Sequence, residues 1–242
     1  MLKIENVEVV GWEAAIRGMR NPKNSWVKSD SHWDYVNQGP EYLTVAHVDD
    51  ADFNIGPNDK KLMSTLRNAG TDHRKFMRMI TVYLDITAPL YWWKEFDTYK
   101  VGTVANSCST MHKIAAKEFT LEDFSCEHLC DDELELLKEI ITRLNMNRIV
   151  FIAKDDKRVD RYSVMTDECY AKYKKKLWWQ MIQLLPSSYN QKRTVMLNYE
   201  VLANIYKSRR HHKLDEWHTL CDWIESLPYS ELITGKEEKA DV

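Results

Sequence analysis

One stretch limits the possible folds of this chain more than any other: a predicted strand followed directly by a helix rich in aromatic residues. Residues 76–86 alternate between apolar and other side chains, which is the pattern of a strand with one buried face. Pro89 then opens a helix rich in tryptophan, since proline is favoured at the first helical position. A segment rich in Gly, Ser, Thr and Asn follows, up to Lys113. The sequence therefore predicts a polar, site-forming loop on a rigid support within residues 85–113.

Helical spacing dominates the rest of the chain. Apolar residues recur every three or four positions, and capping residues or prolines mark the ends of these stretches. The predicted helices cover residues 13–19, 59–68, 133–148, 166–185, 199–209 and 215–227. A further strand is predicted over 3–10, a strand-like or transitional stretch over 193–198, a structured loop or a pair of short elements within 21–58, and a charged turn at 155–160. These elements predict one helix-rich α+β domain over residues 1–234, with a central antiparallel or mixed sheet, and a charged flexible tail at 235–242.

The overall charge argues against one broad class of partner. The 242 residues include 34 lysines and arginines and 37 aspartates and glutamates, for a formal net charge of −3. A protein that binds long nucleic acids is usually basic, so no nucleic-acid polymer is expected, whereas a small anionic ligand needs only a few local cations. No apolar run approaches the roughly 18 residues of a membrane span, so no membrane partner is expected.

The cysteines and the N-terminal sequence indicate a compartment. The start, MLKIENVEVVG, lacks the apolar core of a secretory signal, and the chain has five cysteines, an odd number. We therefore expect reduced thiols and a cytoplasmic protein.

Two cysteine-containing stretches suggest chemical hypotheses. The sequence CEHLC (126–130) offers two thiols and a histidine, but tetrahedral zinc needs a fourth ligand and no second Cys/His pair with usable spacing is present. Small apolar cysteines beside a surface histidine are the favoured interpretation, so no metal is expected. Cys108, with His112 nearby, could be a nucleophile activated by a base. An inert loop thiol is favoured because no perturbing partner is in view, and the catalytic residues stay unassigned.

Basic residues gather in two places. Residues 209–213 are five basic side chains in a row, which repel one another unless an anion lies among them. This run is interpreted equally well as a phosphate or carboxylate site or as a solvated helix end whose dipole favours cations. The lysines within residues 172–176 are interpreted as a solvated helix face. The sequence contains no GxGxxG, GxxxxGK[ST] or GxSxG, which argues against Rossmann, P-loop and hydrolase sites.

Four pieces of the sequence together resemble the flavin-dependent thymidylate synthase family. They are AIRGMRN, a short helix ending at AG, the joint VYLDITAPLYWWKEF, and the block LLPSSYN…LNYEVLANIYKSRRHHKLDEW. That block is similar to the family's LP-x-x-x-Y, N-x-x-x-L-x-N and R-x-x-x-H-A-Q-W run. The pieces occur in the family's order over residues 10–225, with weak identity.

The resemblance implies a thymidylate synthase-complementing-protein-like fold with FAD as cofactor. The family's signature RHRxxSxxxxSxR follows the aromatic helix, where its first triplet contacts flavin and its later serine and arginine hold the nucleotide. By position, the implied cofactor-binding residues here are Lys100, Thr103, Asn198 and Asn204. The implied nucleotide-binding residues are Cys108, Thr110, Lys192, Arg209, Arg210 and His212.

Two departures from the family leave the activity open. The signature triplet has degenerated to Thr98-Tyr99-Lys100, and Glu200 replaces an arginine between the paired asparagines. One hypothesis is an FAD-dependent methyltransferase that acts at C5 of dUMP or a related pyrimidine nucleotide. The other is a catalytically inactive or repurposed nucleotide-binding protein on the same scaffold. The family's active unit is a homotetramer with ligand sites at subunit junctions, so a homotetramer is expected by analogy.

Overall fold

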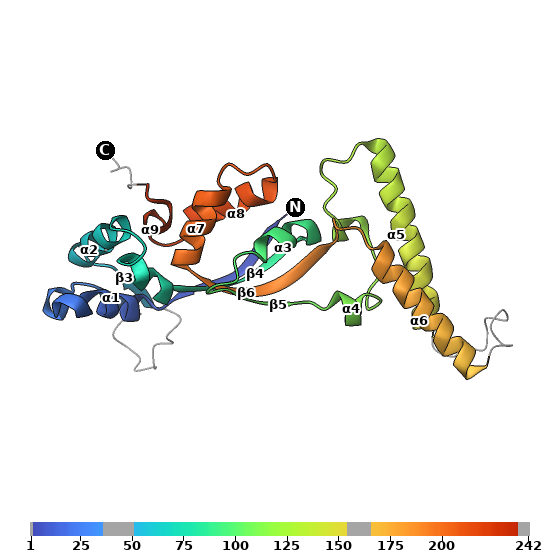
Figure 1. Ribbon diagram of the computed structural model, residues 1–242, viewed down its shortest axis with the longest axis horizontal. Helices are drawn as coiled ribbons and strands as arrows, with labels where there is room; N and C mark the ends of the chain where they lie inside the picture. Colours follow the sequence, from blue (N-terminus) through green and yellow to red (C-terminus); the bar gives the residue numbers. More distant parts are fainter. Residues whose placement is uncertain (1, 36–50, 154–165, 237–242) are drawn as a thin grey trace, which may run out of the picture.

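A four-stranded antiparallel sheet forms the centre of the molecule (Figure 1). The computed structural model describes residues 2–35, 51–153 and 166–236. In spatial order, the strands are β1 (Lys3–Val10), β4 (Thr81–Pro89), β6 (Asn190–Asn198) and β5 (Val104–Ser107). Several helices gather over one face and one end of the sheet, and a long helical hairpin stands at the other end. The molecule is therefore elongated, and the predicted helix-rich α+β architecture is confirmed.

The two faces of the sheet differ in their surroundings. Along β4, Val82, Leu84 and Ile86 are buried, whereas Tyr83 is exposed and Asp85 is half-buried. Successive strand residues point to opposite faces, so the apolar set faces the helices. We call the face that carries Tyr83 and Asp85 the open face.

Three helices pack on the covered face. They are α3 (Leu90–Phe96), α7 (Tyr199–Arg209) and α8 (Asp215–Glu225). Pro89 ends β4 and is also the N-cap of α3, which is why the strand passes into the helix without a loop. Trp92 and Trp93 of α3 are buried, and the ring centroids of Trp92 and Trp217 lie 4.8 Å apart. Because aromatic side chains each bury a large apolar area, these rings anchor the main core.

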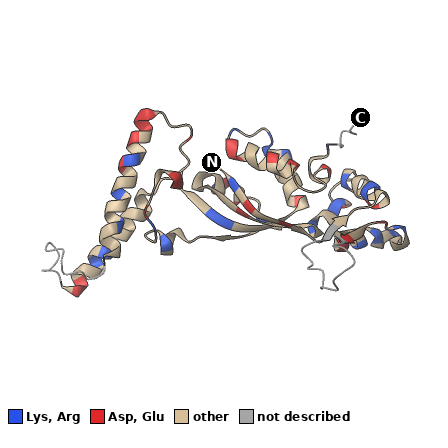
Figure 2. Ribbon diagram, turned by 180° about the vertical axis from the view of Figure 1, so that it is seen from behind, with Lys and Arg blue, Asp and Glu red and all other residues tan. Residues whose placement is uncertain are grey.

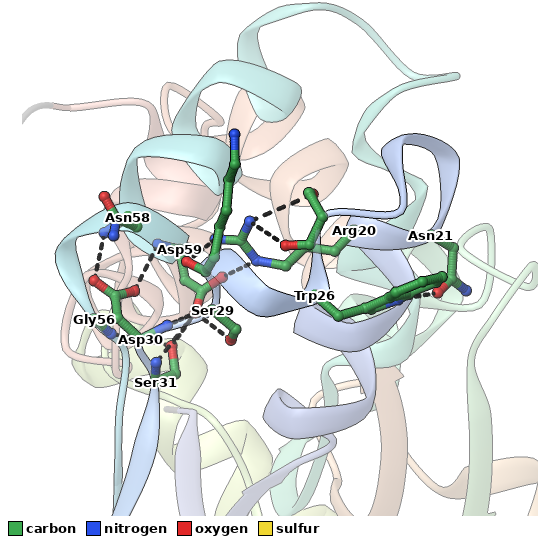
Figure 3. A network of polar contacts seen from close by, with 11 residues as sticks. Arg20, Asn21, Trp26, Ser29, Asp30, Ser31, Gly56, Asn58 and Asp59 are labelled. Carbon is green, nitrogen blue, oxygen red and sulfur yellow. Dashed lines mark hydrogen bonds and ion pairs between the residues drawn. The ribbon is translucent and has the colours of Figure 1, made fainter.

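A group of short elements lies at the end of the sheet opposite the helical hairpin (Figure 1). They are α1 (Trp12–Arg20), the 3-10 turns η1 (Asn21–Lys23) and η2 (Trp26–Lys28), the paired strands β2 (His32–Tyr35) and β3 (Ala51–Asn54), α2 (Pro57–Asn68) and α9 (Glu231–Thr234). The fully buried carboxylate of Asp59 accepts hydrogen bonds from Ser29, Ser31 and Arg20, the last at 2.6 Å (Figure 3). A buried charge must be paired and hydrogen-bonded to be stable, so this network holds residues 29–31 against α1 and α2.

The opposite end of the molecule is the helical hairpin. It consists of α5 (Asp131–Ile152) and α6 (Asp167–Leu184), and η5 (Leu121–Asp123) and α4 (Thr110–Lys113) precede it in the chain. Leu144 and Met181 are fully buried in a second hydrophobic core. The predicted cap of α6 is confirmed, because the Thr166 hydroxyl accepts a hydrogen bond from the Cys169 N–H. Among the described helices, none combines the length and apolar character needed to cross a membrane.

One predicted strand begins later than the sequence pattern indicates. The start of the stretch 76–86 belongs to the 3-10 helix η4 (Arg74–Met79), and β4 starts only at Thr81. The neighbours Phe76 and Met77 are both buried, which a strand with one covered face does not allow. The connection 21–58 does contain short elements. Its residues 36–50 and the predicted turn at 155–160 lie outside the described residues.

Candidate functional site

Three of the predicted nucleotide-binding residues line one pocket. Lys192 on β6, Cys108 just after β5 and Thr110 at the start of α4 surround a cavity of about 340 Å³. The pairing of β5 with β6 brings them together, since the Cys108 N–H donates to the Lys192 carbonyl at 3.0 Å. We call this cavity the Lys192 pocket. The same register places Lys192 opposite Thr87, so the pocket lies at one end of the open face.

No sequence pattern predicted the other residues that line the Lys192 pocket. Gln191 donates from Nε2 to the Cys108 carbonyl at 2.9 Å, which fixes the loop after β5. The Ser109 hydroxyl caps α4 by accepting from the His112 N–H at 3.1 Å. Lys113 enters the pocket from the same short helix. A helix of four residues shows no periodicity, so no pattern in the sequence marks Lys113.

Two carboxylates hold Lys192 at the edge of the pocket. Its Nζ lies 3.1 Å from Asp85 Oδ2 and 3.4 Å from Glu5 Oε2. The hydrogen bond that Lys192 donates to Asp85 and the charges of both acids raise the pKa of Lys192. Hydrogen bonds from Thr194, Asn6 and Lys192 lower the pKa of Asp85 to about 2. Lys192 therefore stays protonated at neutral pH, with its charge largely offset by these acids.

Lys113 is the freer cation of the pocket. Its ammonium makes no ion pair or side-chain hydrogen bond with any described residue, whereas the neighbouring Lys117 pairs with Asp123. An ammonium beside the hydroxyls of Ser109 and Thr110 can bind an anionic group. The pocket is also large enough for a small organic ligand. The arrangement therefore suits a small anion with hydrogen-bonding groups.

The predicted cofactor-binding residues Asn198 and Thr103 lie together at the other end of β6. Asn198 is the N-cap of α7, and its Oδ1 accepts from the Val201 N–H at 3.0 Å. Gly102 has a φ of +76°, and a Cβ added there would come 2.9 Å from Asn198 Nδ2. The Thr103 hydroxyl is buried without a hydrogen-bond partner in the described part of the chain. The Thr103 hydroxyl can therefore bond to a polar group of a cofactor, and Gly102, which has no side chain, lets that group approach the backbone.

Arg74 is a cation that sequence reasoning missed. Its Nε lies 2.9 Å from Glu200 Oε2, and its Nη2 donates to Asn204 Oδ1 at 3.3 Å. The negative charge of Glu200, a reversal relative to the family, is therefore neutralised by η4. No local pattern could have revealed this pair, because 126 residues separate the partners. Lys100, the remaining cofactor candidate, is exposed shortly after α3.

The residues of the Lys192 pocket lie away from the predicted cofactor-binding residue Asn198. Lys192 and Asn198 are six residues apart on β6, and a strand advances about 3.3 Å per residue. Lys192 and Asn198 are therefore separated by about 20 Å along this strand.

Three of the five basic residues at 209–213 pair with acidic side chains of the same chain. Arg209 Nη1 lies 2.8 Å from Glu95 Oε2, and its Nε donates to the Tyr99 hydroxyl at 2.9 Å. His212 Nε2 lies 3.4 Å from the same Glu95 oxygen. Arg210 pairs with two acids of α8. Acids from α3 and α8 thus relieve the repulsion that suggested an external anion, and the role of these residues in nucleotide binding stays a prediction.

The side chains of the CEHLC stretch have separate partners. His128 Nε2 lies 3.0 Å from Asp215 Oδ2, and the Cys130 thiol donates to Glu133. Among the residues that the structure describes, no group of three or more His, Cys, Asp or Glu side chains is arranged to hold a metal ion.

Solved structures that share this fold include flavin-dependent thymidylate synthases. The Helicobacter pylori enzyme complexed with FAD and dUMP matches with a TM-score of 0.59 at 15% identity, over 96% of this chain and 98% of that chain. A second structure of that enzyme with FAD and dUMP gives 0.57 at 14% identity, over 97% and 98%. A UMP/dUMP methylase from Streptomyces cacaoi, bound with 5-Br dUMP, gives 0.49 at 10% identity, over 93% and 89%. No family model and no curated protein matches the sequence.

The comparison defines the class of fold. This chain has the α+β fold seen in the flavin-dependent thymidylate synthase of Helicobacter pylori, and the predicted fold class is confirmed. At 15% identity, the likeness shows the fold alone, so ligand and activity rest on the residues of this chain.

Proposed function

We propose that this protein binds a pyrimidine nucleotide in the Lys192 pocket and, with FAD, methylates C5 of dUMP or a related nucleotide. One observation carries the proposal. Cys108, Thr110 and Lys192 were selected from the sequence by resemblance, and they meet in one cavity of about 340 Å³. That cavity belongs to a fold whose solved examples include an enzyme complexed with FAD and dUMP.

The cations and hydroxyls of the pocket support a phosphate-bearing ligand. Lys113 supplies an ammonium without an ion pair among the described residues, and the hydroxyls of Ser109 and Thr110 line the same pocket. Lys192 sits opposite, held in place by Asp85. These residues would bind the phosphate and orient the pyrimidine ring.

The residues around Asn198 would hold the flavin. The Thr103 hydroxyl lacks a hydrogen-bond partner among the described residues, and Lys100 offers an exposed cation for the cofactor's phosphates. Asn204 already shares a hydrogen bond with Arg74, which places a second cation beside this group. When bound, flavin supplies the electron-transfer chemistry that the side chains lack.

The separation of the two groups supports a site shared between subunits. About 20 Å along β6 separates Lys192 from Asn198, so one chain alone would hold the nucleotide and the cofactor at opposite ends of this strand. In a homotetramer, the cofactor group of one subunit can meet the nucleotide group of another. We expect light scattering to give a mass near four times the 28.7 kDa of one chain. A mass near one chain would contradict the shared site.

Calorimetry with dUMP tests the nucleotide site. Lys192→Gln and Lys113→Gln should each weaken dUMP binding about tenfold, since each loses a charge-assisted hydrogen bond. Lys138→Gln is the matched control, because Lys138 is similarly exposed, pairs with Glu135 and does not line the pocket. Absence of dUMP binding, or equal affinity in all three variants, would overturn the proposal.

A flavin-free nucleotide-binding protein is the second candidate. It is favoured by Tyr99, which replaces the histidine of the family's flavin-contacting triplet and whose hydroxyl oxygen accepts a hydrogen bond from Arg209. The visible spectrum after incubation with FAD and gel filtration separates the two candidates. Retained flavin absorption supports the enzyme, whereas a colourless protein that still binds dUMP supports the second candidate.

A further inference from the structure

A second pocket, lined by exposed aromatic rings, lies beside α1. Its volume is about 350 Å³, and Trp26, Trp33 and Phe53 line it. Trp26 is 47% exposed and Trp33 is 41% exposed. The ring centroids of Trp33 and Phe53 lie 4.9 Å apart in an edge-to-face arrangement. Solvent-exposed tryptophans that line one pocket indicate a binding surface rather than part of the core. We call this cavity the aromatic pocket.

A buried arginine also lines the aromatic pocket. Arg20 is 4% exposed, and its Nε donates to Asp59 Oδ1 (Figure 3). Its two terminal nitrogens donate to the Ser25 and Lys28 carbonyls, each at 3.1 Å. The Ser25 hydroxyl is a fourth acceptor at 3.5 Å. A guanidinium has five N–H groups, so one remains for an acceptor on a ligand.

Two further groups of opposite charge stand on α1 at the rim. Glu13 and Arg17 are one helical turn apart, so they project from the same side of the helix. Both are exposed, and neither has a side-chain partner among the described residues. Arg17 can bind two oxygens of a phosphate or carboxylate, and Glu13 can accept an N–H from a ring substituent.

A neighbouring cavity extends the space around Trp33. It measures about 340 Å³, and Glu13, Arg17 and Trp33 line it as well as the aromatic pocket. A ring between the tryptophans can therefore carry a substituent that passes Arg17 and reaches this second space.

We propose that the aromatic pocket binds a planar heteroaromatic ring that carries a phosphate or a carboxylate. The ring stacks on Trp26 and Trp33, its acceptor faces the spare N–H of Arg20, and its anionic group pairs with Arg17. The site is distinct from the Lys192 pocket, because α1 and the β2–β3 pair lie at the opposite end of the molecule from α4 (Figure 1). The inference does not depend on the proposed function.

Calorimetry on the full chain tests this assignment with three probes. AMP carries a phosphate, quinoline-2-carboxylate carries a carboxylate, and adenosine has a ring without an anion. We expect at least one of the two anionic probes to bind more tightly than adenosine. The tighter of the two identifies the anionic group. Trp26→Ala should weaken that probe at least tenfold, because base stacking on an aromatic ring is lost. Arg17→Gln should weaken the anionic probe and leave adenosine unchanged.

Matched variants at the other end of the molecule provide the controls. Trp179 on α6 is 44% exposed, and Arg143 on α5 is exposed without a side-chain partner in the described chain. Trp179→Ala, Arg143→Gln and Lys192→Gln should leave the affinity of the anionic probe unchanged. The proposal is overturned if no probe binds, if Trp26→Ala and Arg17→Gln bind normally, or if any of the three controls weakens binding equally.

Discussion

Arg209 Nη1 lies 2.8 Å from Glu95 Oε2, and this ion pair joins the end of α7 to α3. The indole N–H of Trp217 on α8 donates to the same oxygen at 2.9 Å. The Arg209 guanidinium also lies 4.7 Å from the ring centroid of Trp217. One carboxylate thus holds three helices of the covered face together.

Arg209→Met should lower the free energy of unfolding by about 1–2 kcal/mol, because it removes a charge-assisted pair that is only partly buried. Arg210→Met is the matched control and should cost less than about 1 kcal/mol, since its partner Asp222 is well exposed. Urea unfolding measures both. Unchanged stability of Arg209→Met together with lost dUMP binding would instead assign Arg209 to the ligand.

Asp59→Asn should be the most damaging single change at the N-terminal end. It would leave the buried Arg20 without its counter-ion, which costs about 3–5 kcal/mol. Burial tends to raise the pKa of Asp59, but hydrogen bonds from Ser31, Ser29 and Arg20 outweigh it and lower that pKa. Stability from this group is therefore present above the unfolded pKa and lost as the pH falls through the folded pKa.

Urea unfolding of Asp59→Asn at neutral pH checks the predicted loss. Asp72→Asn serves as the control, because Asp72 is exposed. Equal stability of the two variants would show that the Asp59 network contributes little.

The decrease in the free energy of unfolding at low pH should depend on Asp85. Its pKa is lowered to about 2, first by the hydrogen bond from Thr194 and then by Asn6 and Lys192. Its contribution is present above the unfolded pKa of about 3.9 and is lost as the pH falls towards 2. Asp85→Asn should therefore flatten the dependence of the urea midpoint on pH across this window. A slope equal to that of the wild type would contradict the assignment.

Two glycines with positive φ allow the cost of backbone strain to be measured apart from the cost of a steric clash. Gly11 has φ +96°, and an added Cβ would come 2.1 Å from the Met79 carbonyl oxygen. Gly70 has φ +104°, with nothing within 4 Å of an added Cβ. Gly70→Ala should cost about 1–2 kcal/mol from backbone strain alone. Gly11→Ala should cost at least about 3 kcal/mol, because displacement of the η4 backbone adds to the strain. Thermal unfolding of both variants gives the comparison, and equal losses would contradict it.

The cysteines should differ sharply in reactivity. Cys221 is fully buried on α8, and burial raises the pKa of its thiol to about 11. Cys108, Cys130 and Cys169 are exposed. At neutral pH, a thiol reagent should label these three thiols in the native protein and reach Cys221 only after unfolding. Peptide mass spectrometry measures the labelling, and rapid native modification of Cys221 would contradict the described burial.

Elements with strong local signals were predictable from the sequence. The strand over 3–10 and the helix over 199–209 are confirmed at both ends as β1 and α7. Alternation, helical spacing and caps are properties of neighbouring residues, so no tertiary information is needed to detect them. The stretch before β4 was the exception, because the buried pair Phe76 and Met77 belongs to a 3-10 helix whose short length leaves no clear period.

The sequence by itself determined the longer helices, the strand β1, the fold class, and three residues of the Lys192 pocket. Only the tertiary structure decided which charges remain free for a ligand. Glu95 and Arg209 are 114 residues apart, and Arg74 and Glu200 are 126 apart. A charge is neutralised by whatever acid or base lies within a few ångströms, and chain folding sets that distance. Arg209, Arg210 and His212 of the basic run, prominent in the sequence, are therefore paired internally, while Lys113 and Arg17 keep their charges unpaired among the described residues.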